Sequence, residues 1–167
     1  MPPVPALLPE HAGRVDPVAD LRAAAGAAVA WLCEGADGVR VVAADGLAER
    51  VARHLLGSST PHRAGTRARA DDAVLVMANG SARRSEKAPG HLDERAHAFD
   101  EALGAALATG DVTALAGIDP VLAAELWATG TEAFAALGGL VVEESQVDYD
   151  DDPFGVAYWV VRWTCAS

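Results

Sequence analysis

The sequence predicts a single α/β domain over residues 1–167, with a mostly parallel or mixed sheet covered by helices. A length of 167 residues is typical of one domain and is enough to bury a core without disulfides or metal ions. Hydrophobic residues make up 51% of the chain and charged residues 22%, which excludes wholesale disorder. Short β-branched runs alternate with helical patterns early in the chain, and two strand-like runs close it, so both kinds of element belong to one mixed fold.

Helices are predicted where apolar residues recur every three or four positions between capping residues. Asp16-Pro17 is typical of a helix start, and Gly35 of a helix end. The clearest pattern begins at Leu92 and predicts that Phe99 and Leu103 are buried. The expected helices cover residues 17–34, 47–56 (with Leu47, Val51 and Leu55 facing the core), 92–110 and 120–137, with a short capped turn at 111–115.

Strands are predicted at residues 39–44, 73–78, 140–149 and 155–164, and residues 58–70 are expected to form a loop. The run Ala73–Ala78 (AVLVMA) is the clearest buried strand. The last two strands can pair across the turn Asp150–Pro153. Apolar residues alternate onto both faces of the final strand, with Trp159 and Trp163 on the same face, which predicts a central position for it.

Charge and composition exclude several classes of partner. The formal net charge is −11, so phosphate backbones repel the chain and no nucleic-acid partner is expected. No run approaches the roughly 18 apolar residues that span a bilayer, so no membrane partner is expected, and no signal peptide is recognisable. The two cysteines, Cys33 and Cys165, have no CxxC spacing, which favours two thiols in a reducing cytoplasm.

Candidate ligand-binding residues follow the strongest strand, because ligands of α/β sheets bind beyond the carboxyl ends of strands. They are Asn79, Ser81 and Arg83 in the loop, and His91 and Asp93 where the next helix begins. The cations of this loop could hold a carboxylate or another small anion. The alternative is that its arginines only pair with surface acids. Histidine spacing matches no metal motif, so no metal ligands are assigned.

The run KAPGHLDERAHAFDEAL, residues 87–103, resembles the actinobacterial branch of LigB-like proteins, relatives of the class III extradiol ring-cleavage dioxygenases. That branch carries a similar APGxLDERAxxFD segment after a strand and a short Gly/Ser-rich loop. LLPEHAG near the N-terminus, IDPVLAAEL, and DDPFGVAYWVVRW at residues 151–163 are similar to further segments of the branch. The resemblance covers most of residues 70–164, more weakly residues 5–56, and implies a LigB-like fold.

The resemblance also implies an Fe(II) site of two histidines and one glutamate, with another histidine as acid/base, and this sequence departs from it. The N-terminal segment Pro2–Pro5 has no histidine, and the stretch between Val42 and Leu47 is shortened where the second would lie. Ala82 stands closest to the acid/base position. Glu132 lies near the position of the metal glutamate.

Two functions from different classes follow. The first is a metal-free protein on a dioxygenase-like scaffold that binds a small molecule or a partner subunit and needs no cofactor. The alternative is an enzyme acting on a small aromatic or carboxylate substrate, such as a divergent extradiol-type dioxygenase, and only this alternative takes Fe(II) as cofactor. A homodimer that protects an exposed apolar patch is expected in either case, because Trp159 and Trp163 share one strand face and the sheet edge left by the shortened segment needs cover.

Overall fold

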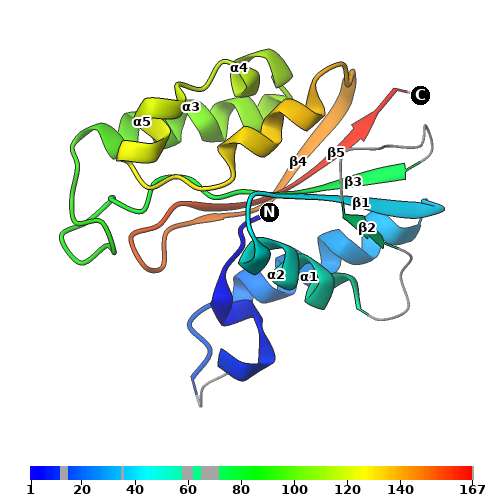
Figure 1. The fold of residues 1–167 in the computed structure, drawn as a ribbon, viewed down its shortest axis with the longest axis horizontal. Coiled ribbons are helices and arrows are strands. Elements are labelled where there is room, and N and C mark those ends of the chain that lie inside the picture. Colours follow the sequence, from blue (N-terminus) through cyan, green and yellow to red (C-terminus); the bar gives the residue numbers. More distant parts are fainter. Residues whose placement is uncertain (12–14, 35, 58–61, 65–71, 167) are drawn as a thin grey trace.

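Strands form the middle layer of the structure, and helices cover both faces of that layer (Figure 1). The computed structural model describes residues 1–11, 15–34, 36–57, 62–64 and 72–166. Its α-helices are α1 (Ala19–Glu34), α2 (Gly46–Leu56), α3 (Arg95–Thr109), α4 (Val112–Ala116) and α5 (Pro120–Glu125). Its 3-10 helices are η1 (Pro5–Leu7), η2 (Pro9–His11) and η3 (Thr131–Leu137). Its strands are β1 (Gly38–Ala43), β2 (His62–Ala64), β3 (Asp72–Met77), β4 (Val142–Asp151) and β5 (Tyr158–Cys165). The chain is thus a mixed α/β structure.

The described strands form two sheets rather than the single sheet expected. Three parallel strands pair in the order β2-β1-β3, and β4 pairs with β5 as an antiparallel hairpin. Backbone hydrogen bonds join the two sheets just beyond β3: the Gly80 N–H donates to the Ala157 carbonyl, and the Ala157 N–H donates to the Ser81 carbonyl, each at 2.9 Å. The β5 segment thus lies between β4, its ladder partner, and the segment that follows β3. The central position predicted for β5 is confirmed only in part, because among the described strands only β4 pairs with it along its length.

The alternation predicted along β5 is confirmed. Val156, Tyr158 and Val160 pack into one apolar cluster with α1, α2 and η1, whereas Ala157 and Trp159 pack into a second cluster with α3, α4 and η3. The strand is apolar on both faces because helices cover both faces, and not because strands flank it on both edges.

The stripe predicted for helix α2 is confirmed at Val51 and, as a partly buried position, at Leu55, but it is wrong at Leu47. Leu47 is 37% exposed, and the buried positions are Ala48, Val51, Ala52 and Leu56. The Asp45 side chain caps the helix by accepting the Ala48 N–H at 2.8 Å. That cap sets where the helix begins and turns Leu47 outward.

Helix α3 confirms the strongest helical pattern, with a correction at one residue. Leu103 is 3% exposed, as predicted, but Phe99 is only partly buried against the second cluster. The helix begins at Arg95, after the Asp93 side chain has accepted the Arg95 N–H at 3.0 Å.

The helix predicted over residues 120–137 is broken. Helix α5 ends at Glu125, and the 3-10 helix η3 begins at Thr131. Between them Trp127 and Gly130 have φ angles of 58° and 76°, in the left-handed region that an α-helix cannot contain. Apolar periodicity continues across the break, which is why the sequence pattern does not reveal it.

The remaining expectations have mixed outcomes. The loop predicted over residues 58–70 contains the short strand β2, which pairs with β1 in parallel, and its other residues lie outside the described ones. Gly35, the expected end of the first helix, also lies outside them.

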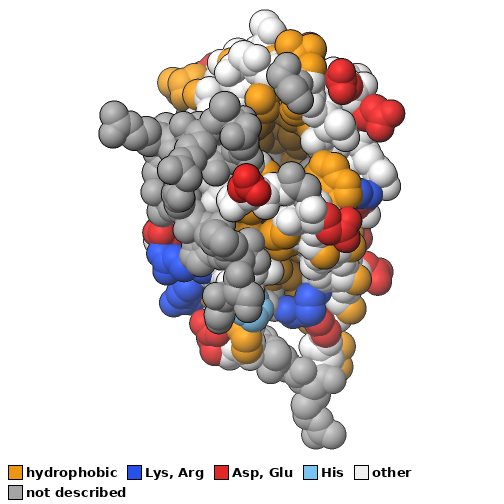
Figure 2. All heavy atoms as spheres, turned by 90° about the vertical axis from the view of Figure 1, so that its right-hand side faces the viewer, with side chains coloured by type: hydrophobic (Ala, Val, Ile, Leu, Met, Phe, Trp, Pro, Cys, Tyr) orange, Lys and Arg blue, Asp and Glu red, His pale blue; other side chains and the backbone are white. Residues whose placement is uncertain are grey.

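No helix in the described ranges is both long and apolar enough to cross a membrane. Figure 2 shows acidic side chains scattered over the face on the right of Figure 1, rather than gathered in one patch.

Candidate functional site

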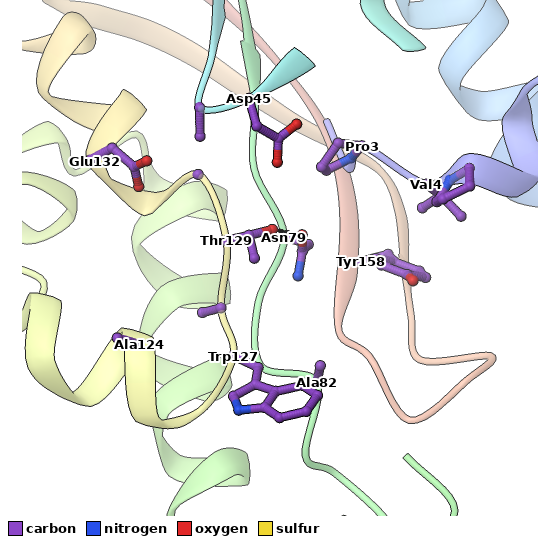
Figure 3. Close-up of a pocket in the computed structure, with 14 residues that line it drawn as sticks. Pro3, Val4, Asp45, Asn79, Ala82, Ala124, Trp127, Thr129, Glu132 and Tyr158 are labelled. Atoms are coloured by element: carbon purple, nitrogen blue, oxygen red, sulfur yellow. Dashed lines mark hydrogen bonds between the residues drawn. The ribbon is translucent and has the colours of Figure 1, made fainter. Parts of the chain in front are cut away.

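A pocket of about 670 Å³ opens beyond the carboxyl ends of the parallel strands β1 and β3 (Figure 3). This is the edge of a parallel sheet at which ligands of α/β proteins bind. Five separate segments line the pocket: the N-terminal residues Pro3–Pro5, the turn after β1 (Ala44 and Asp45), the loop after β3 (Asn79 and Ala82), the region from Ala124 to Glu132, and Tyr158 of β5.

Asn79 lies in the middle of the pocket and is fixed there by Thr129 and Gly80. Its backbone N–H donates to the Thr129 carbonyl at 3.0 Å, and its side-chain oxygen accepts the Thr129 hydroxyl at 2.5 Å. Its side-chain nitrogen donates to the Gly80 carbonyl at 2.8 Å. The amide nitrogen has a second proton, so the pocket has a pre-oriented hydrogen-bond donor.

Trp127 lies at one end of the pocket beside Ala82, as Figure 3 shows. Its backbone has a φ of 58°, and its side chain is 52% exposed. A bulky residue in the left-handed region costs about 1–3 kcal/mol and tends to occur at functional sites. This backbone conformation places a large aromatic ring where it contacts both solvent and the pocket.

Tyr158 lines the pocket from β5 and is only 7% exposed. Burial raises the pKa of its phenol to about 12, so the hydroxyl is neutral at pH 7. No described residue forms a hydrogen bond with this hydroxyl. The β5 wall of the pocket therefore includes a nearly buried side chain whose hydroxyl can still accept or donate a hydrogen bond.

Two carboxylates lie at the other end of the pocket. Asp45 caps α2 and Glu132 lies in the first turn of η3, and both side chains are exposed. Figure 3 shows both carboxylate groups on the side of Asn79 that is opposite Trp127. Among the described residues that line the pocket, none has a cationic side chain.

Ser81 lies behind the pocket lining and is fully buried. Its N–H donates to one oxygen of Asp100 at 2.8 Å, and its hydroxyl donates to the other oxygen at 2.6 Å. Desolvation raises the pKa of the Asp100 carboxyl despite these hydrogen bonds and the Arg84 guanidinium 3.6 Å away. The pair anchors the loop after β3 to helix α3, and so holds Asn79 and Ala82 in position.

Both arginines of the same loop lie close to acids. Arg84 lies 2.7 Å from Asp152, and Arg83 lies 3.9 Å from Asp93 and donates to the Glu125 carbonyl at 2.9 Å. Arg83 and Arg84 thus have the ion pairs that the alternative interpretation of the loop expects. A second hollow of about 690 Å³ lies next to this loop, between Ser85–Pro89 and Asp152–Gly155.

Asp93 and His91 lie at the start of α3, away from the pocket lining. Asp93 forms a bidentate pair with Arg95 at 2.8 and 3.0 Å, and the hydrogen bonds from Arg95 lower its pKa to about 2. His91 is exposed and has a φ of 57°. The structure therefore brings Arg83 and Asp93 near each other, whereas Asn79 is the one candidate of the five that lines the pocket beyond β1 and β3.

Sequence reasoning missed three of the side chains that shape the pocket. Asp45 follows β1 just as Asn79 follows β3, so the rule that selected Asn79 also selects Asp45. Trp127 and Tyr158 gave no local signal, because a break in a helix and the face of a hairpin bring them to the pocket.

No protein-family model matches this chain, and no curated protein matches it.

Proposed function

We propose that the protein binds a small molecule, with an aromatic part, in the pocket beyond β1 and β3, on a LigB-like scaffold that has lost its metal centre. The observation that carries this proposal is the convergence of Asn79, Trp127 and Tyr158 on one pocket. Together they offer an oriented amide, an exposed aromatic ring and a hydroxyl that no described residue uses. Ligand sites of α/β proteins combine this kind of mainly apolar wall with a few placed polar groups.

The resemblance to class III dioxygenases supports the same pocket. The segments that it relates to the iron site are Pro2–Pro5, the stretch between Val42 and Leu47, Ala82 and Glu132. Residues from all four line this one pocket, including Pro3, Asp45, Ala82 and Glu132. Segments so far apart in sequence would not be expected to meet there by chance, so the coincidence favours a shared scaffold.

The donor set of the pocket does not fit the iron site of such enzymes. A site with two histidines and one carboxylate is typical of non-haem Fe(II) oxygenases. The described residues that line the pocket include the carboxylates of Asp45 and Glu132 and no imidazole. This donor chemistry favours the metal-free binding protein over the divergent dioxygenase. Protein purified without chelators should contain less than stoichiometric Fe or Mn by elemental analysis, and about one tightly held ion per chain would contradict the proposal.

The binding function is tested by NMR titration with a panel of small aromatic compounds of different charge. We expect shifts at the Trp127 indole N–H and at the Asn79 side-chain amide. Trp127→Ala should weaken binding, whereas the control Trp31→Phe should not, because Trp31 instead packs under Arg162, 5.1 Å from its guanidinium carbon. Shifts that cluster around Arg83 and His91, or no shifts at all, would overturn the assignment of this pocket.

That the protein is cytoplasmic remains a prediction, which depends on the spacing of its two cysteines. A homodimer also remains a prediction, and its test is given in the Discussion.

A further inference from the structure

The geometry points to a pocket that selects organic cations, ammonium compounds with an aromatic or alkyl part, over neutral and anionic compounds of the same shape. This inference rests on the proposed binding function and adds the charge of the ligand to it.

The charges around the pocket favour a cation. Asp45 and Glu132 contribute two carboxylates to one end, and no described lining residue offsets them with a cationic side chain. Helix N-termini lie beside both acids and carry a partial positive charge of about half a unit each. The Asp45 carboxylate already caps the N-terminus of α2 through one of its oxygens. The balance at this end of the pocket remains negative.

The aromatic residues of the pocket favour a cation as well. Trp127 offers the face of an indole, the best of the side-chain rings for binding ammonium groups, and the ring is 52% exposed. Tyr158 offers a hydroxyl oxygen that no described residue uses, although the side chain is only 7% exposed. A neutral phenol oxygen accepts a hydrogen bond from an ammonium N–H.

An anion would find no counter-charge in the pocket. The arginines of the loop after β3 are engaged by Asp93, Asp100 and Asp152, and neither Arg83 nor Arg84 is among the lining residues. The structure thus favours the opposite ligand charge from the carboxylate that the loop sequence suggested.

The experiment compares three compounds that share one ring: benzylamine, benzyl alcohol and benzoate. Each is titrated at pH 7 and low salt, up to tens of millimolar, with shifts followed at Trp127, Asn79 and Thr129. We expect benzylammonium to bind most tightly and benzoate most weakly. Raising the salt to about 1 M shortens the screening length to roughly 3 Å and should reduce the preference for benzylammonium over benzoate.

Charge-neutral variants locate the effect. Glu132→Gln and Asp45→Asn should each weaken benzylammonium binding up to about fivefold, the range of exposed ion pairs, and leave benzyl alcohol binding unchanged. Asn is a good N-cap, so Asp45→Asn should preserve α2. Glu101→Gln on the exposed surface of α3 is the matched control, because it removes one negative charge outside the pocket lining.

The outcomes separate this inference from the proposed function. If the shifts of the pocket residues show that benzoate or benzyl alcohol binds at least as tightly as benzylammonium, the pocket binds small molecules but does not select cations, and the inference is wrong. If Glu101→Gln weakens benzylammonium as much as Glu132→Gln does, the preference comes from net charge and not from this pocket, and the inference is again wrong. If none of the three compounds shifts these residues, both the proposed function and the inference fail.

Discussion

Trp127 combines backbone strain with exposure, two properties that a residue chosen for stability alone would not have. A left-handed backbone costs an L-residue roughly 1–2 kcal/mol relative to glycine. Trp127→Gly and Trp127→Ala remove the same ring, but only glycine relieves the φ of 58°. We expect the glycine variant to be more stable than the alanine variant by about 1 kcal/mol in urea unfolding. An alanine variant of equal or greater stability would show that this backbone is relaxed.

Asp100 gives the protein a component of stability that weakens as the pH rises. Desolvation raises the pKa of this carboxyl above its ordinary value of 3.8, so the folded state holds the proton to higher pH than the unfolded state does. Above pH 3.8 the folded state binds more protons, and the free energy of unfolding therefore falls as the pH rises towards the folded pKa. Asp100→Asn should remove this part of the slope in urea titrations between pH 4 and 7. An unchanged slope would contradict the raised pKa.

Asp93 provides a control, because its effect on the pH dependence of stability has the opposite sign to that of Asp100. Its hydrogen bonds from Arg95 lower its pKa from 3.8 to about 2, so it stabilises the fold above pH 3.8. That contribution is lost as the pH falls through about 2. Asp93→Asn should flatten the acid side of the stability profile and leave the region above pH 5 unchanged.

At the scale of elements, α3 packs onto the strands through Leu103. This side chain is 3% exposed within the second apolar cluster, whereas Leu92, before the helix, is 41% exposed. Leu103→Ala should lower the free energy of unfolding by about 2–5 kcal/mol, because it leaves a cavity. Leu92→Ala should change it by less than about 1 kcal/mol. Similar losses for the two variants in thermal or chemical unfolding would mean that the helix presents another face to the core.

The two clearest patterns in the chain, the α3 stripe and the AVLVMA strand, correspond to real elements, whereas strand β2 and the break after α5 have no pattern that reveals them. Regular burial of one helix face, or of a whole strand, leaves a periodic trace in the sequence. Strand β2 has three residues and is defined by its pairing with β1, so it leaves none. The break between α5 and η3 is hidden because both halves remain apolar on one side.

At the scale of the whole molecule, the grounds for a homodimer have changed. Trp159 is buried in the second cluster, and the Trp163 indole donates to the Leu107 carbonyl at 2.9 Å, so neither ring leaves an open patch on β5. Strand β4 carries five acids along its ten residues (VEESQVDYDD), and like charges oppose edge-to-edge pairing.

A homodimer remains a prediction from the sequence, and sedimentation at high micromolar concentration tests it. Because the net charge is −11, copies of the chain repel one another, and association should strengthen as salt screens that repulsion. A monomer at both low and high salt would contradict the prediction.

The sequence by itself determined the mixed α/β class, most of the helix and strand positions, the alternation of β5 and the place of Asn79 after β3. These depend on local periodicity and on a general rule for strand ends, both of which can be read within one segment. Only the tertiary structure decided which side chains share the pocket. Asp45, Asn79, Trp127 and Tyr158 come from four separate segments, and two of them arrive through a helix break and a hairpin face. Periodicity shows which face of an element is buried, but not which distant side chains meet at the edge of a sheet, because that depends on how the elements pack against one another.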